Sequence, residues 1–348
     1  MSRGTLQTLD TLASSQQTIA EIGEDNAFQA IDAALVAHNE IVTEMTDNLA
    51  ETTVDRQRRY GAVDAMEMEE MDEHGTPDAQ KVTAGITVGF PLRLYGIAVQ
   101  WTRKFFQNAT GEELAKQFVA ATTADLRRIE RQLKFALFTP VNYVFVDKLI
   151  DHVELNVKGL CNADGAGIPL GPQGQEFNGA THNHYLATAS LAEADVVALL
   201  ETIIEHQATG KAYLYINRAQ ETAVRAMSKF TPYTPVNIIP GANTQEAVGT
   251  LNPNLLYDRA IGDFDGTAEV WVKPWIPAGY MLAFLSGVRK PLVFRVRNAG
   301  AGLSLVADDE AYPLRARIFE REFGVGVYTR TNGAVLYTGG GTYQAPAL

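Results

Sequence analysis

The stretch VWVKPWIPAGYMLAFLSG, from Val270 to Gly287, has the best-organised pattern in the chain. Its apolar and aromatic residues stand in short runs, which Pro274, Pro277 and Gly279 separate. Paired β-strands joined by tight turns are typical of such spacing. Because similar runs continue to Leu336, we expect one long β module over residues 267–336. The module has no nucleophile–base pair, metal cluster or phosphate loop, which favours a structural role over catalysis.

The composition of the chain argues against nucleic-acid-binding, disulfide-bonded and membrane-spanning classes of protein. The chain has 348 residues, 46% of them hydrophobic, and a formal net charge of −12, which argues against a nucleic-acid-binding surface. Its single cysteine, Cys161, allows no intrachain disulfide and fits a reducing compartment. We find no secretory signal and no apolar run of the roughly 20 residues needed to span a bilayer. These features predict a soluble, cytoplasmic protein without a membrane segment.

Two amphipathic helices are expected. Residues 1–24 are polar and predict a flexible arm that orders on a partner; a helix follows from Phe28 to Leu49, capped by Asp25 or Asn26. The second helix, residues 110–138, begins with a T-x-x-E capping box and spans roughly 43 Å. Its basic face consists of Arg127, Arg128, Arg131 and Lys134.

Between these helices, residues 52–97 predict a long β-hairpin. Both ends favour β conformation, whereas the middle is strongly acidic. The acids of this tip are Asp64, Glu67, Glu69, Glu70, Asp72 and Glu73. Two interpretations stay open, a solvated tip or a contact with a basic partner, and Met66, Met68 and Met71 favour the contact.

The middle of the chain predicts a compact α/β domain. A glycine-rich region (158–185) precedes a helix that Ser190 and Glu193 are expected to cap and that should stop at Gly210. The segment KAYLYI (211–216) predicts a buried strand, after which Asn217 caps a further helix.

His182 and His184 are the one close histidine pair, and alternate residues on a strand share a face. A metal site needs a third ligand, and none is evident from the sequence, so we favour polar loop residues over a metal site. We therefore expect no catalytic residue, cofactor or metal. A metal-dependent enzyme using His182 and His184 remains a minor alternative.

The order of elements resembles the major capsid protein family of tailed phages, which has the Hong Kong 97 fold. The most specific part is EVWVKPWIPAGYMLAFLSG (269–287), which is similar to the family's strand, P-x-G turn and strand; RKPLVFRVRN and the strands after it resemble the family's closing strands. The resemblance implies an α+β fold with an N-arm, an extended β-hairpin (the E-loop), a long spine helix in a P-domain and an α/β A-domain. The implied segments are 1–51 (N-terminal arm with its helix), 52–100 (E-loop), 101–140 (spine helix), 141–290 (A-domain), 291–324 (P-domain strands) and 325–348 (C-terminal strand and tail).

The same resemblance implies a function. Such a protein self-assembles as hexamers and pentamers into an icosahedral procapsid and then a mature head around double-stranded DNA. Scaffolding, portal and decoration proteins are the further partners, assembly takes place in the host cytoplasm, and the product is the virion capsid. An encapsulin-like compartment shell is the alternative within the same fold.

Two expectations concern contacts between subunits. The acidic tip should face a neighbour's basic surface, made by the basic helix face (Arg127, Arg128, Arg131 and Lys134) or by Arg315, Arg317 and Arg321. Some members of the family crosslink a Lys to an Asn with the help of a Glu. Lys81 and Glu320 match, but Pro313 stands near the Asn position, so we expect no crosslink unless Asn298 substitutes.

Overall fold

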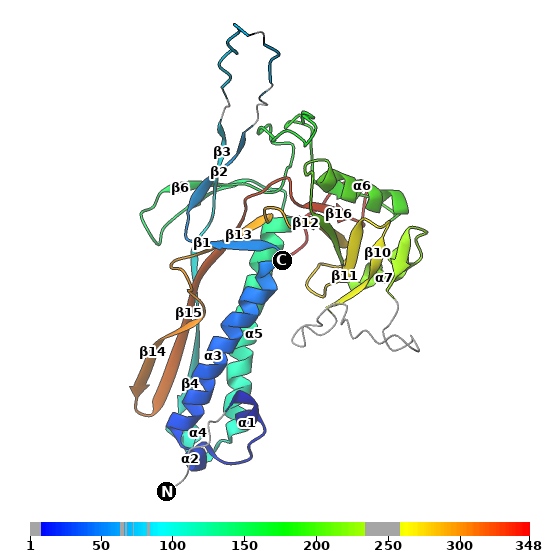
Figure 1. Cartoon of the computed structure of the whole chain (residues 1–348). Coiled ribbons are helices and arrows are strands. Elements are labelled where there is room, and N and C mark those ends of the chain that lie inside the picture. The colour runs from blue at the N-terminus through cyan, green and yellow to red at the C-terminus, as the bar shows by residue number, and fades with distance from the viewer. Residues whose placement is uncertain (1–7, 63–65, 67, 72, 82–83, 234–257) are drawn as a thin grey trace.

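The computed structural model describes residues 8–62, 66, 68–71, 73–81, 84–233 and 258–348. Within these residues the chain forms two larger sheets, two small two-stranded sheets and several helices. Figure 1 shows an elongated body in which two long helices lie along one sheet. A rounder part holds the other large sheet, and a narrow hairpin projects away from both.

Helix α5 (Gly111–Phe138) is the longest element of the described chain. Its capping box is confirmed: Thr110 Oγ1 accepts from Glu113 N–H at 3.4 Å, and Glu113 Oε2 accepts from Thr110 N–H at 3.0 Å. The face with Leu114, Phe118, Ile129 and Leu133 is buried. It packs against α3 (Glu24–Asp47) and against strands β4 (Arg93–Thr102) and β15 (Leu314–Val327) of the adjoining sheet, so this helix is the axis of the elongated body (Figure 1).

The five-stranded sheet centres on the long strand β15 (Leu314–Val327), whose first part lies between two antiparallel neighbours and whose last part pairs with β13. A parallel strand, β1, completes the sheet beyond β13. The other members are β1 (Ala50–Thr53), β4 (Arg93–Thr102), β13 (Leu292–Val296) and β14 (Ser304–Ala311).

The seven-stranded sheet forms the rounder part and mixes parallel and antiparallel pairs, in the order β7-β16-β12-β8-β11-β10-β9. Its helices are α6 (Glu193–Ile204) and α7 (Arg218–Arg225). The strands are β7 (Tyr185–Ala187), β8 (Lys211–Ile216), β9 (Phe230–Pro232), β10 (Arg259–Phe264), β11 (Ala268–Val272), β12 (Tyr280–Ser286) and β16 (Ala334–Tyr337). One apolar core lies between this sheet and α6, and another joins it to α5 and the five-stranded sheet.

The expectation of a single β module over residues 267–336 is wrong. Strands β11, β12 and β16 belong to the seven-stranded sheet, whereas β13, β14 and β15 belong to the five-stranded sheet. The chain changes sheet after Gly287, where a positive φ of 78° lets it turn. Strands β12 and β13 are both apolar and buried, and their partners, β8 and β1, come from distant segments, so local spacing cannot assign them to a sheet.

The expected flexible arm is also wrong for the part of residues 1–24 that the structure describes. Residues 8–22 form α1 (Leu9–Ala13) and α2 (Ile19–Ile22), which bury Leu12, Ile19 and Ile22 against α3, α5 and the short helix α4 (Arg103–Asn108). Thr18 and Glu21 form a capping box that the sequence analysis missed. These three buried side chains fix the short helices on the core. Residues 1–7 lie outside the described part.

Two helix starts differ from the expected ones. Helix α3 begins after Gly23 without a side-chain cap, and Asn26 instead donates to Ile22 O at 2.9 Å. Helix α6 begins at Glu193, where Asp195 accepts from Ala192 N–H at 2.8 Å, and it ends at Ile204 rather than near Gly210. The cap of α7 is confirmed, since Asn217 Oδ1 accepts from Ala219 N–H at 2.9 Å.

The predicted hairpin is present as β2 (Gln57–Ala62) and β3 (Ala84–Gly89). Its base is anchored, because Tyr60, Val88 and Phe90 are buried with Val293 and Tyr328. The strand after it, β4, belongs to the five-stranded sheet, while β3 contacts β6 of a small sheet made by β5 (Tyr143–Val146) and β6 (Glu154–Val157). The hairpin therefore has a fixed base and a projecting end (Figure 1).

Among the described helices, none combines the length and the apolar character that crossing a membrane requires.

Candidate functional site

The projecting end of the hairpin exposes acidic and thioether side chains. Glu69, Glu70 and Glu73 are exposed, and so are Met66, Met68 and Met71. Asp64, Glu67 and Asp72 lie outside the described residues. The carboxylates of this surface suit contact with a basic partner, and its methionines adapt readily to a contacting surface.

The basic helix face on α5 lies beside an open groove. Arg127, Arg128 and Arg131 are exposed. The Arg128 guanidinium lies 5.0 Å from the centre of the Tyr95 ring, and Arg131 Nη2 donates to Leu348 O at 2.6 Å. Lys134 pairs with Glu130 at 3.6 Å. Arg128 and Arg131, with Arg93, line the groove, whose volume is about 600 Å³, so positive charge is concentrated there.

The second set of basic candidates, Arg315, Arg317 and Arg321, forms ion pairs within the subunit. Arg321, with 3% of its side chain exposed, pairs with Asp125 at 2.9 Å, and burial lowers its pKa while Asp125 opposes that shift. Arg317, 5% exposed, lies between Asp308 and Asp32. We therefore withdraw Arg317 and Arg321 from the predicted contact between subunits, because both charges are already neutralised in a buried setting.

Arg315 is more exposed than Arg317 and Arg321, with 22% of its side chain accessible. Its guanidinium pairs with Asp308 at 2.9 Å and with Glu24 at 3.1 Å. The hydrogen bond from Arg315 lowers the pKa of Asp308 below its ordinary value. This cation therefore supports the packing of the N-terminal helices on the sheet.

The residues considered for a crosslink lie on separate elements. Lys81 is exposed on the projecting part of the hairpin, and Glu320 is half-buried on β15, opposite Gly96 of β4. Pro313 is exposed in the turn between β14 and β15, and Asn298 is exposed after β13.

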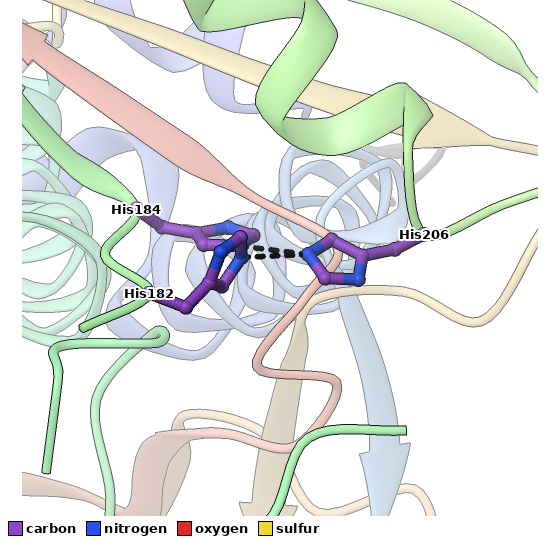
Figure 2. A group of neighbouring side chains, drawn as sticks. All are labelled: His182, His184 and His206. Atoms are coloured by element: carbon purple, nitrogen blue, oxygen red, sulfur yellow. Dashed lines mark hydrogen bonds between the residues drawn. The ribbon is translucent and has the colours of Figure 1, made fainter. Parts of the chain in front are cut away.

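A third histidine joins the expected pair. His182 and His184 precede β7, and His206 follows α6; Figure 2 shows the three imidazoles pointing at one another. The Nε2 atom of His182 is 2.8 Å from Nε2 of His184 and 2.8 Å from Nε2 of His206, and the third separation is 3.2 Å. Burial lowers the pKa of all three rings, that of His206 to about 3.

The expectation that the pair lacks a third ligand is thus wrong. His206 is missed by sequence spacing because a whole helix separates it from His184. The expected strand–helix–strand order could have indicated it. A helix that connects two strands of one sheet ends near that sheet, so the residues after α6 come close to the segment that enters β7.

Comparison with known proteins gives the fold. No family model and no curated protein matches the sequence. Among solved structures, a chain from Mycobacterium phage Patience superposes with a TM-score of 0.70 at 22% identity, over 99% of this chain and 96% of that chain. This chain therefore has the fold of that phage chain.

Weaker similarities are found to two further solved structures. The capsid of a native GTA particle has a TM-score of 0.48 at 13% identity, over 86% of this chain and 91% of that one. The holo-SrpI encapsulin complex from Synechococcus elongatus has a TM-score of 0.43 at 11% identity, over 88% and 90%.

The expected mixed α+β class is confirmed.

Proposed function

We propose that this chain is the major capsid protein of a tailed phage and self-assembles, as hexamers and pentamers, into the icosahedral head. The observation that carries the proposal is the fold match over 99% of this chain and 96% of a chain from Mycobacterium phage Patience. Nearly every element of one chain has a counterpart in the other, so little of either is left for a separate activity.

In this proposal each element has a family role. The β2–β3 hairpin, within residues 52–100, is the E-loop, and α5, within 101–140, is the spine helix of the P-domain. The seven-stranded sheet belongs mainly to the A-domain (141–290), and the strands within 291–324 belong to the P-domain. Residues 1–51 and 325–348 are the N-terminal arm and the C-terminal tail.

The contact between subunits is proposed to join opposite charges. The hairpin tip offers exposed Glu69, Glu70 and Glu73, and the basic helix face with its groove offers exposed Arg127, Arg128 and Arg131. One exposed ion pair contributes only about 0–1 kcal/mol and is screened by salt. Because every subunit of a shell repeats the contact, the sum favours the assembled state.

The contents of the shell follow from the same proposal. The head encloses double-stranded DNA without sequence-specific contacts, which suits a subunit with a net charge of −12. Scaffolding, portal and decoration proteins are the further partners, and assembly is placed in the host cytoplasm before the virion is complete.

Particle contents separate this function from an encapsulin-like shell. Particles that carry this chain, isolated from their natural source and treated with nuclease, should retain protected double-stranded DNA. A cargo protein in place of DNA would support the encapsulin-like alternative instead.

We expect the mature shell to lack covalent crosslinks. Proline has no carboxamide for a lysine to attack, and Pro313 stands near the position where the family has its Asn. Denaturing electrophoresis of mature particles should give a single band near 38 kDa, the mass of one chain. A ladder of multimers that resists boiling and reductant would refute this, and the variant Asn298→Ala would then show whether Asn298 supplies the amide.

A further inference from the structure

The three-histidine cluster (His182, His184 and His206) cannot be explained by hydrogen bonds alone. His184 Nδ1 lies 2.7 Å from Gly333 O, and a carbonyl oxygen only accepts, so Nδ1 carries the proton. Because charging a buried imidazole is unfavourable, His184 is neutral and its Nε2 presents a lone pair.

A proton count shows the conflict. The cluster has three close Nε2–Nε2 contacts, of 2.8, 2.8 and 3.2 Å. Only His182 and His206 can carry a proton on Nε2, so at most two of the three contacts can be hydrogen bonds. At least one contact then sets two lone pairs, or two N–H groups, against each other in a buried place, which is unfavourable. A cation among the three nitrogens would accept every lone pair at once.

The spacing suits zinc. Zn–N bonds of about 2.0–2.1 Å in a tetrahedron place the ligand nitrogens roughly 3.3–3.4 Å apart, so the rings need to move by only a few tenths of an ångström. Glu205 Oε1 lies 3.7 Å from His182 Nε2 and 3.8 Å from His206 Nε2. The hydrogen bond of His184 Nδ1 to a backbone carbonyl is the outer-shell contact that usually orients a metal-binding histidine.

We propose that His182, His184 and His206 bind one Zn²⁺ ion as a structural site, with Glu205 or a solvent molecule at the fourth position. The ion would fasten the end of the glycine-rich region to the segment just after α6. Through the hydrogen bond of His184 Nδ1 it would also hold Gly333, the residue before β16. This proposal is independent of the assembly function, since it concerns the single chain.

The position of the site gives it a mechanical role. His206 also lines a cavity of about 170 Å³ together with Tyr60 and Gly61 of the hairpin base, which offers the ion an entry path. Pro169 of the glycine-rich region lies against Gly61, where an added Cβ would be 2.6 Å from the proline ring. By fixing that region, the ion would fix a support of the projecting hairpin.

The test uses the full chain without a histidine tag, stripped with a chelator and titrated with Zn²⁺ alone. We expect about one Zn²⁺ per chain, a rise in the unfolding temperature with zinc, and with Co²⁺ alone the visible bands of a four-coordinate cobalt–imidazole site. The variant His182→Asn should lower zinc affinity by at least about a hundredfold, since even outer-shell changes cost 10–100-fold. It should also lose the cobalt bands.

The matched control is His152→Asn, the same substitution at an exposed histidine outside the cluster. Its φ of 61° is one that asparagine tolerates, so it should bind zinc as the natural chain does. If His182→Asn does not fold, His206→Gln replaces it. The proposal is overturned if the natural chain binds no zinc, if the cluster variant binds as well as the control, or if both variants lose binding together.

Discussion

Replacing Arg295 with methionine should lower the free energy of unfolding by about 3–5 kcal/mol, the cost of leaving a buried charge without its partner. Arg295 Nη2 donates to Asp147 Oδ2 at 2.7 Å, and Nη1 donates to Phe90 O at 2.8 Å. The two side chains are 2% and 0% exposed. Methionine keeps most of the side-chain length, so the loss reports on charge rather than on volume.

Urea unfolding of the unassembled subunit measures this loss. The double variant Arg295→Met/Asp147→Asn removes both charges and should recover part of the stability. The control Lys229→Met breaks an exposed pair, with Lys229 37% and Asp265 48% exposed, and should cost far less than Arg295→Met. Equal losses for Arg295→Met and Lys229→Met would contradict the importance of the buried pair.

Shortening the hairpin should separate folding from assembly. Replacing residues 63–83 with Asn-Gly joins β2 to β3 through a two-residue turn that suits the pairing of Ala62 with Ala84. The buried base with Tyr60 and Val88 stays intact, so we expect the free energy of unfolding to change by less than about 1 kcal/mol, the size usual for changes outside a core. Closed shells should no longer form.

Light scattering and electron microscopy measure assembly of the shortened chain, with scaffold supplied where the natural chain needs it. The matched variant Glu69→Gln/Glu70→Gln/Glu73→Gln keeps the length and removes described charges of the tip. It should form shells that dissociate at lower salt than those of the natural chain. Normal shells from the shortened chain would show that the hairpin makes no essential contact.

Local signals in the sequence predict local structure well here. The capping box at Thr110 and Glu113 and the regular apolar spacing predict α5 to within one residue, because both signals act within one or two helical turns. The hairpin strands, β8 and the cap at Asn217 follow from equally short patterns.

The sequence does not predict features that depend on contacts between distant segments. Which sheet β12 and β13 join depends on partners far along the chain. Arg317 and Arg321 look like exposed cations until Asp32 and Asp125 come from other helices to neutralise them. His206 joins His182 and His184 only when α6 packs on the sheet. Helices α1 and α2 are not predicted because each has few apolar residues. Those residues are buried only by α3, α4 and α5, whose positions the local sequence does not give.

If this chain builds a closed shell, electron microscopy of the purified protein, concentrated with scaffold supplied, should show it. We expect round, closed particles of uniform size whose walls consist of this chain in hexamers and pentamers. A folded protein that stays strictly monomeric at high concentration under these conditions would contradict it.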